Sequence, residues 1–393
     1  MLAAHARLGA VLSRWRASPS MQLGFFIMPV HPRDRDYAEI LQEDRELTLI
    51  AEKLGFAEAF FGEHVTDATE RITSSLLFVA SLINETKTIK LGTGTINMAS
   101  HHPAQVAAQV AMVDHMARGR FIMGISPGNL TSDAEVFGTL DADRNAMLVE
   151  AMDHVLALWA GEPPYDLVGK YWSISTRRTF TPQFGVGYFP KPYQKPHPPI
   201  VVTVVAPYSK GVTHAAARGW NPISANFLLP QWVKTHWPKY AEGCQQGGRP
   251  ADPANWRVAK SIFVADDLAT ARRYATDSAG PYYGYYNSLV AKLIDHGRAN
   301  LFKADQNAPD SSVTIERAVD DLVIWGTPDK VVDDLLAFRE QIGDFGTLLY
   351  ASHDWADRKL SIRSMELMAE KVMPAVNAAT SLSTDMQKTR RKK

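Results

Sequence analysis

Short apolar runs alternate with longer amphipathic segments from residue 21 onward. Short runs rich in branched and aromatic residues are typical of buried parallel strands, and apolar positions recurring every three to four residues are typical of helices. The strand-like runs cover, in chain order, 22–28, 59–63, 89–96, 120–125, 199–205, 220–225, 257–264 and 346–351. This alternation predicts an α/β fold, a (β/α)8 TIM barrel with insertions after strand four and after strand seven.

The segments between the early strands carry the start and stop signals of helices. Gly55 follows the first amphipathic segment, and Pro103 suits the first turn of a later one, because a missing N–H costs nothing there. The helices predicted in this way cover 38–54, 74–84, 103–115 and 145–160.

Two stretches interrupt the alternation and form the predicted insertions. Residues 162–197 are rich in Pro, Gly and aromatic residues without periodicity, and residues 278–320 contain a Tyr-Tyr-Gly-Tyr-Tyr run at 282–286. Long segments of this kind inside compact domains are usually functional. We therefore expect both insertions to lie over the site and to close on an apolar ligand.

Composition narrows the class of protein. The chain has 393 residues, of which 46% are hydrophobic, with 42 basic and 42 acidic side chains. This balance argues against nucleic acid or a membrane surface as a partner, and no apolar run approaches the ~18 residues of a spanning helix. The single cysteine, Cys244, excludes an internal disulfide and suits a reducing, cytoplasmic location. We expect one domain over residues 21–380.

The two ends of the chain differ from this domain in composition. Residues 1–20 carry Arg and His within an Ala- and Leu-rich pattern and have no acidic residue, which fits either a targeting peptide or a disposable extension. We favour the extension, because residues 21–26 already begin the first strand. Residues 381–393 are polar and end in four basic residues, so we expect a flexible basic tail.

Three consecutive predicted strands end in polar or Gly-rich residues. Glu63 and His64 close the second strand, Gly94, Thr95 and Asn97 end the third, and Ser126 to Asn129 follow the fourth. The chemistry of (β/α)8 barrels gathers at these strand ends, so the pattern indicates an enzyme. His64 could move a proton or stabilise an anion near neutral pH, although on its own a structural role under a loop would be the better interpretation.

Several motifs suggest other chemistry only weakly. The pair His101-His102 lacks further ligands at useful spacing, so we predict no metal site. Gly92 and Gly94 lack the third glycine of a dinucleotide fingerprint, and we interpret them as room for a flat ring beside the backbone. His353, after the eighth strand, fits a pocket residue or a loop anchor.

The turn after strand five is a candidate anion site. It contains Pro207, Tyr208, Ser209 and Lys210 and precedes a helical run. Backbone N–H groups at the start of a helix point at a bound anion, and Ser209 adds a hydroxyl group. The alternative is an ordinary helix cap, which is common.

The order and residue sequences of these motifs resemble those of the bacterial luciferase-like flavin-dependent monooxygenases, particularly the limonene-monooxygenase-type branch. The resemblance extends from about residue 22 to 376, and its motifs are Met28-Pro29-Val30-His31-Pro32, Gly62-Glu63-His64, His101-His102-Pro103, Pro127-Gly128-Asn129 with Ser132-Asp133-Ala134, and Gly326-Thr327-Pro328-Asp329. It implies an enzyme that takes reduced FMN (FMNH2) from a separate NAD(P)H:flavin reductase. With O2 as co-substrate, a C4a-hydroperoxyflavin then oxygenates a small hydrophobic substrate. The resemblance also implies a homodimer.

The resemblance assigns roles to individual residues. It implies that His64 and Glu63 form the catalytic pair and that His353 lines the substrate pocket. It also implies a non-prolyl cis peptide at Gly94–Thr95, beneath the flavin ring.

The remaining cofactor contacts follow from the same resemblance. Asn97, Ser126 and Asn129 would face the pyrimidine edge of the flavin, and His102 would position the adjoining loop. The turn at 207–210 would hold the phosphate. Luciferase has an arginine for the phosphate just after strand four, but this chain has Pro127 there, so that contact is absent or supplied elsewhere.

Two rival functions stay open. A deazaflavin (F420)-dependent oxidoreductase shares the barrel but transfers hydride without O2, and a non-catalytic flavin-binding protein would show no turnover. The substrate itself is not fixed, because the insertions that line such pockets vary most freely.

Overall fold

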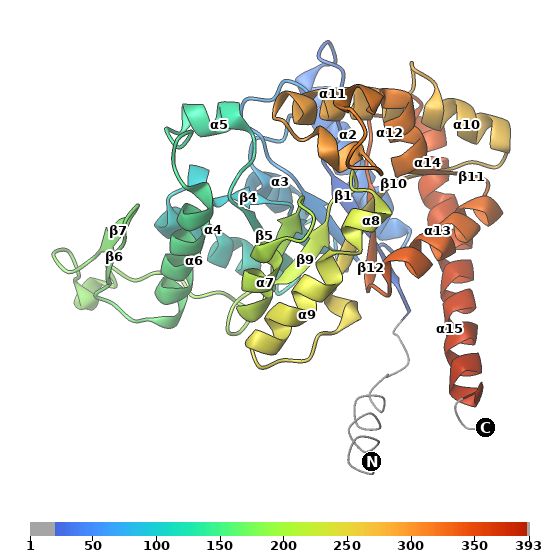
Figure 1. Cartoon of the computed structure of the whole chain (residues 1–393). Helices are drawn as coiled ribbons and strands as arrows, with labels where there is room; N and C mark the ends of the chain where they lie inside the picture. Colours follow the sequence, from blue (N-terminus) through green and yellow to red (C-terminus); the bar gives the residue numbers. More distant parts are fainter. Residues whose placement is uncertain (1–19, 391–393) are drawn as a thin grey trace.

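The computed structural model describes residues 20–390, and within this range eight parallel strands close into a barrel surrounded by helices (Figure 1). The barrel strands are β1 (Gln22–Ile27), β2 (Glu58–Phe61), β3 (Lys90–Thr93), β5 (Phe121–Ser126), β8 (Ile200–Val204), β9 (Asn221–Ser224), β10 (Arg257–Val264) and β12 (Thr347–Ala351). Strand β10 pairs with both β12 and β9, which closes the barrel. The predicted TIM barrel is confirmed.

Apolar side chains fill the barrel interior. Six strands each contribute one residue to a single buried cluster, which is distinct from the larger core outside the barrel. Its members are Phe60, Ile122, Val201, Ile223, Ala259 and Leu349. A larger core lies between the barrel and its helices. At the N-terminal end of the strands, Arg257 of β10 binds the buried Glu58 of β2 through two hydrogen bonds of 2.6 and 2.9 Å. The interior therefore opens toward the C-terminal ends of the strands.

The third barrel strand is interrupted where the resemblance implied. A cis peptide bond joins Gly94 to Thr95, between β3 and the short β4 (Ile96–Asn97). Beside it, β3 and β5 approach so closely that a Cβ at Gly124 would lie 1.8 Å from the carbonyl oxygen of Thr93. Gly92 has a different role from the one predicted: a Cβ there would lie 2.5 Å from the ring of Phe60, so it makes room for a core side chain.

Helices cover the outside of the barrel and follow the predicted signals. The four expected early helices are α2 (Tyr37–Lys53), α3 (Ser75–Leu82), α4 (Pro103–Ala117) and α6 (Arg144–Ala160). Asp36 caps α2 and Ser74 caps α3 through their side-chain oxygens. The later helices include α7 (Lys210–Ala217), α9 (His236–Gln246), α10 (Leu268–Thr276), α13 (Pro328–Ile342) and α14 (Arg358–Leu367).

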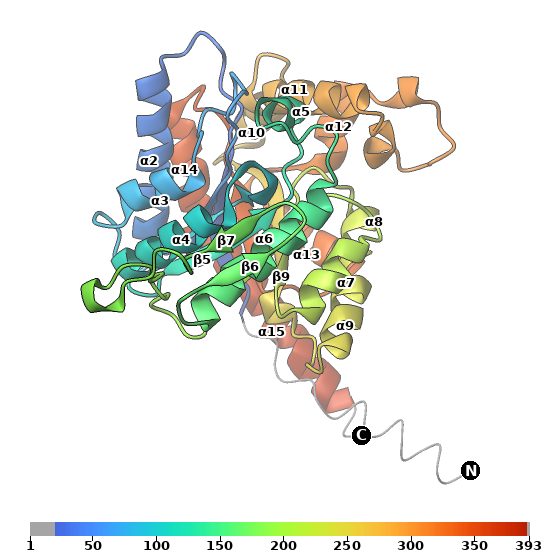
Figure 2. The same ribbon diagram turned by 90° about the vertical axis from the view of Figure 1, so that its left-hand side faces the viewer.

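The first insertion, residues 162–197, does not lie over the mouth of the barrel. Its hairpin, β6 (Asp166–Val168) and β7 (Ser173–Ser175), projects outside α6 in both views (Figures 1 and 2). Gln194 near its end binds Asp114 and the carbonyl group of Phe121, at the start of β5. The prediction of a lid was wrong for this segment, because it returns the chain from the end of α6 to the start of β8.

The second insertion does cover the mouth. It contains α11 (Pro281–Asp295) and α12 (Ile315–Leu322) and leads into β11 (Val323–Gly326), which pairs with the end of β10. In both views α11 lies at the same end of the barrel as the short helix α5 (Thr131–Val136) (Figures 1 and 2). The hydroxyl group of Thr131 lies 3.3 Å from Nε2 of His296, so α5 meets the end of α11.

The C-terminal segment, for which a flexible basic tail stays a prediction, is largely helical. Helix α15 (Met373–Arg390) continues through most of residues 381–393, since neither Gly nor Pro follows Pro374 to end it. The expected extension at residues 1–20 lies, apart from its last residue, outside the described range, as do residues 391–393. Among the described residues, no helix combines the length and the apolar character needed to cross a membrane.

Candidate active site

A cavity of about 380 Å³ lies at the C-terminal ends of the barrel strands. Its volume falls within the range of small-molecule sites, roughly 300–1,000 Å³. Seven of the predicted site residues line it, namely Glu63, His64, Gly94, Thr95, Asn97, Ser126 and Asn129. The opposite wall comes from β9 and α11 and is largely apolar, with Ile223, Phe227, Leu289 and Leu293. The cavity therefore places a polar face opposite an apolar one.

His64 lies between two carboxylates. Its Nδ1 is 3.3 Å from Asp133 of α5, and its Nε2 is 3.4 Å from Glu70 in the loop after β2. Asp133 also accepts hydrogen bonds from the backbone N–H groups of Val65 and Thr66, which holds the loop around His64. Burial would lower the pKa of His64, but Asp133 and Glu70 outweigh it and raise the pKa. The two carboxylates therefore favour the protonated form of the imidazole.

Lys292 connects helix α11 to this loop. Its ammonium group forms an ion pair with Asp67 and lies 3.2 Å from Glu70. Burial would raise the pKa of Asp67, but Lys292 and the hydroxyl group of Thr69 lower it to about 2. The helix that forms one cavity wall is thus attached by charge to the loop that holds His64.

Glu63 fastens three segments together at the polar face. One carboxylate oxygen accepts hydrogen bonds from the backbone N–H and the hydroxyl group of Ser75, at 3.0 and 2.8 Å. The other oxygen accepts from the backbone N–H of Asn97 and lies 2.9 Å from Nε2 of His101. Burial would raise the pKa of Glu63, but its donors, led by His101, lower the pKa. Glu63 is therefore a charged anchor, and its carboxylate is fully engaged by protein donors.

A short hydrogen-bond network follows from this anchor. The hydroxyl group of Thr95 donates to Oγ of Ser126 at 2.7 Å, and Ser126 donates to Oδ1 of Asn97 at 2.9 Å. The Nδ2 of Asn97 donates in turn to the carbonyl group of Glu63. Three of the predicted cofactor residues are thus ordered beside the strand-three break, with polar atoms along one edge of the cavity.

His353 does not line this cavity, contrary to the expectation. It is buried behind the rings of Tyr282 and Tyr285, whose centroids are 4.1 and 4.6 Å from its own. Its Nε2 lies 3.1 Å from the hydroxyl group of Ser261, and burial lowers its pKa to about 3. A neutral histidine covered by two rings has no direct role in the cavity. Of the two tyrosines, Tyr285 lines the cavity.

The other predicted residues lie near the cavity without lining it. His102 caps α4, with Nδ1 accepting from the backbone N–H of Ala104 at 3.2 Å, which fits a role in positioning the loop. Pro207, Tyr208, Ser209 and Lys210 are not lining residues, and the cavity wall ends at Val205, just before this turn. The backbone N–H of Tyr208 is directed away, to the hydroxyl group of Thr235.

Sequence reasoning missed several lining residues. Nδ2 of Asn226, just after β9, donates to the hydroxyl groups of Ser261 and Tyr285, each at 3.1 Å. Arg144 and Arg298 also line the cavity. Asn226 follows a strand and could have been found by that signal. The arginines lie at a helix start and in an insertion, where no strand-end pattern points to them.

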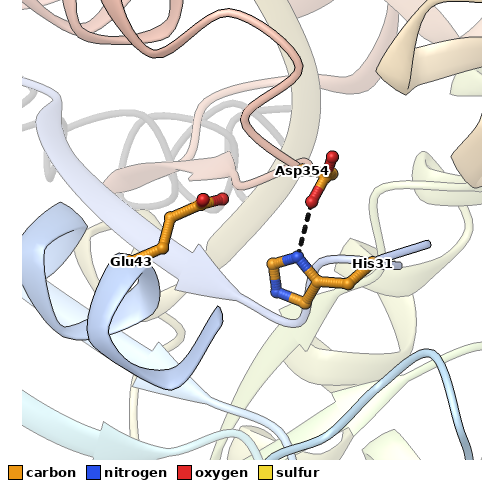
Figure 3. Close-up of side chains that lie close together, drawn as sticks. All are labelled: His31, Glu43 and Asp354. Carbon is orange, nitrogen blue, oxygen red and sulfur yellow. Dashed lines mark hydrogen bonds and ion pairs between the residues drawn. The ribbon is translucent and has the colours of Figure 1, made fainter. Parts of the chain in front are cut away.

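A second cluster of ionisable groups lies outside the cavity. Figure 3 shows His31, Glu43 and Asp354 converging, and the side-chain atoms with which they could bind a metal lie within 4.8 Å of one another. However, Arg35 binds both carboxylates, at 2.6 Å from Asp354 and 2.8 Å from Glu43. A guanidinium group between the carboxylates repels a metal cation. The cluster is an ion-pair network that fastens the loop after β1 to α2 and to the loop after β12.

Comparison with known proteins agrees with this geometry. The model of the luciferase-like monooxygenase family matches residues 21–344. The chain belongs to this family. Named relatives of the luciferase-like chain include 4-hydroxyprotoasukamycin monooxygenase from Streptomyces nodosus subsp. asukaensis, 30% identical over 91% of this chain and 93% of the relative. Limonene 1,2-monooxygenase from Rhodococcus erythropolis is also 30% identical, over 91% of this chain and 87% of the relative.

A solved structure supports the same luciferase-like fold. The oxygenating constituent of 3,6-diketocamphane monooxygenase from Pseudomonas putida, a type II Baeyer-Villiger monooxygenase in complex with FMN, superposes with a TM-score of 0.82. It is 24% identical and covers 91% of this chain and 98% of its own. The likeness establishes the fold, and the named relatives establish that this luciferase-like chain is similar to monooxygenases.

The residues of the cavity fit a flavin. Gly94 and Thr95 line one wall, and the ordered polar groups of Asn97 and Ser126 lie beside them as hydrogen-bonding partners for a heterocycle. Arg144 and Arg298 supply positive charge for a phosphate. The apolar wall leaves room for a second, hydrophobic molecule.

Proposed function

We propose that this chain is a monooxygenase dependent on reduced FMN, the oxygenating component of a two-component system. A separate NAD(P)H:flavin reductase would supply the cofactor, as the two-part naming of the diketocamphane enzyme suggests. The observation that carries the proposal is that His64, Gly94 and Thr95 border one cavity of about 380 Å³. When bound, reduced FMN would react with O2 and provide the oxygen atom that enters the substrate.

The polar face would orient the flavin ring. In this proposal the ring lies against Gly94 and Thr95, and its pyrimidine edge faces Asn97, Ser126 and Asn129. Asn97 and Ser126 hold each other through a 2.9 Å hydrogen bond, which supports a fixed donor and acceptor pattern. Such preorganised partners cost little reorganisation when the cofactor binds.

His64 would serve as the proton donor and the local positive charge. Asp133 engages Nδ1 and thereby orients the ring. Asp133 is hydrogen-bonded to Nδ1, whereas Glu70 makes only an ion-pair contact with Nε2 at 3.4 Å, so the proton on Nε2 would be available to a reacting oxygen atom. Despite its burial, Asp133 and Glu70 raise the pKa of His64, which favours the charged imidazole. Glu63 would take no part in proton transfer and would only hold the surrounding segments in position.

The substrate would be a small hydrophobic organic molecule. Leu289 and Leu293 of α11 and Ile223 of β9 supply an apolar wall opposite the polar face. Apolar surface of this kind favours a ligand without charge. The names of the relatives cover both a limonene 1,2-monooxygenase and a Baeyer-Villiger enzyme, so the proposal leaves the type of oxygenation open. We also propose that the chain forms a homodimer, as the family resemblance implies.

The test is to mix the protein with reduced FMN without air, add O2, and follow flavin absorbance and O2 consumption. We expect a long-lived species whose spectrum differs from reduced and oxidised flavin, with faster decay in His64→Asn. His214→Asn, an exposed histidine on α7, is the matched control and should behave as wild type. Oxidation no faster than that of free flavin would contradict the proposal. Reduction of a deazaflavin without O2 would favour the hydride-transfer alternative.

A further inference from the structure

A row of buried ionisable groups leads from His64 to a groove on the surface, and the proposed function gives this row no role. At the outer end, His31 and Asp354 line the groove, which has a volume of about 610 Å³ and lies between the loop after β1 and α11. At the inner end, His64 lines the cavity of about 380 Å³. Asp44 of α2 lies between the two ends: it contacts His31 and shares a second, smaller cavity with His64.

The smaller cavity has the size of one water molecule. Its volume is about 10 Å³, and a single buried water needs roughly 10–15 Å³. Its polar lining residues are Asp44, Glu63, His64, Glu70 and Arg71. Glu63 already uses both carboxylate oxygens on other donors. The remaining polar groups suit a hydrated cavity, because a buried water is held by several polar partners.

Asp44 offers this cavity an unused oxygen atom. The residue is 2% exposed, and its Oδ2 lies 3.5 Å from Nε2 of His31. Within residues 20–390 its Oδ1 is buried and has no hydrogen-bond partner. Such an oxygen is stabilised by a polar molecule beside it. Burial raises the pKa of Asp44 against the opposing effect of His31, which makes it easier for this carboxylate to take up a proton.

The contacts on either side of Asp44 complete the row. On the outer side, Nδ1 of His31 lies 2.7 Å from Oδ1 of Asp354, the contact drawn in Figure 3. On the inner side, Glu70 lies 3.4 Å from Nε2 of His64. Glu70 lines both the small cavity and the large one, so it borders the water site and the reaction site together.

His64 needs such a route once the large cavity is occupied. In the proposed function its Nε2 gives up one proton in each turnover, and that proton must be replaced before the next. A flavin and an apolar substrate would then fill the cavity in front of His64 and keep water away from it. A route from behind avoids this conflict.

We propose that one buried water molecule binds Oδ1 of Asp44 and completes a proton relay that recharges His64, an inference that rests on the proposed function. A proton passes from Nε2 of His31 to Asp44 and through the water to Glu70. Glu70 passes it to Nε2 of His64. His31 regains a proton from the groove, so one solvent proton replaces each proton delivered and no group of the relay is consumed.

The water site can be tested without flavin, by a high-resolution crystal structure of the full chain. We expect one ordered water within roughly 3.2 Å of Oδ1 of Asp44 and within the same distance of Glu70 or His64. A small cavity without water density, or one filled by the side chain of Arg71, overturns the inference.

The relay is tested with Asp44→Asn, which keeps the shape of the side chain but cannot pass a proton on. Oxidation of anionic reduced FMN by O2 to FMN and hydrogen peroxide moves two electrons and consumes one proton, so no substrate is needed. Protein loaded with reduced FMN is mixed with O2 in weak buffer. Flavin absorbance follows the oxidation, and a pH indicator dye follows proton uptake from solvent.

We expect the two signals to coincide in wild type and to separate in Asp44→Asn. His64 starts with its proton, so flavin oxidation should stay within about twofold of wild type, whereas proton uptake should lag by about tenfold or more. Asp114→Asn is the matched control. Asp114 is a buried carboxylate on another helix, α4, where it binds Gln194, and it lines neither cavity. Its two signals should coincide as in wild type.

The ratio of the two rates separates the possible outcomes. Damage to the fold or to the surroundings of His64 slows both signals alike, so the ratio is insensitive to it. Signals that still coincide in Asp44→Asn, or that separate equally in Asp114→Asn, overturn the relay. Wild type that oxidises reduced FMN no faster than free solution refutes the proposed function instead, and the crystal structure still decides the water site.

Discussion

Replacing Glu63 by Gln should destabilise the protein strongly, although the two side chains have nearly the same shape. Each oxygen of Glu63 accepts two hydrogen bonds, one of them from a backbone N–H group: Ser75 on one side and Asn97 on the other. Gln has one oxygen, so its NH2 group must face one of these backbone donors. Neither donor can rotate away, because each belongs to the main chain.

The magnitude follows from the burial of the site. Glu63 is 5% exposed, so the unpaired N–H group cannot be satisfied by bulk water. An unsatisfied buried donor costs about 1–3 kcal/mol, and the lost charge-assisted bond to His101 adds about 1–2 kcal/mol. We expect Glu63→Gln to lower the free energy of unfolding by roughly 3 kcal/mol.

Glu52→Gln is a matched control for this substitution. Glu52 accepts from the backbone N–H groups of Lys87, Thr88 and Ile89 through a single oxygen, Oε1. Gln can keep its oxygen in that position, so the expected loss is below about 1 kcal/mol. Urea unfolding at neutral pH measures both variants. If Glu63→Gln loses no more stability than Glu52→Gln, the argument from two separate oxygen sites is refuted.

Two further substitutions test the packing and the charges. Gly124→Ala should lower the unfolding free energy by at least about 3 kcal/mol, since the new Cβ would meet the backbone of Thr93 at 1.8 Å. Gly284→Ala, in open space on α11, is the control and should cost nothing. Equal urea midpoints for the two variants would contradict the prediction. Burial would lower the pKa of His31, but Asp354 and Asp44 raise it to about 9. Its stabilisation is then complete below pH 6.5 and lost as pH rises through 9, a decrease of about 3 kcal/mol that should be missing in His31→Gln. A wild-type unfolding free energy that stays constant from pH 6 to 9.5 would refute this role of His31.

Strand positions were predictable because buried parallel strands are short apolar runs, and side chains at their C-terminal ends meet at one face. That reasoning brought Glu63, His64 and Ser126 together correctly. It failed for residues 162–197, whose aromatic content suggested a lid, because composition does not say at which end of a barrel a connection lies. It also failed for His353, because the rings that cover it come from α11, far away in the sequence.

The contact between Lys292 and the loop after β2 links the position of α11 to the basicity of His64. Lys292 offsets the charges of Asp67 and Glu70, and Glu70 lies 3.4 Å from the imidazole. If α11 moves away, both carboxylates lose their counter-ion, and His64 holds its proton more tightly. By thermodynamic reciprocity, loss of that proton favours the closed arrangement. Movement of α11 to admit a substrate and loss of the proton from His64 therefore oppose each other, because both act on the same equilibrium.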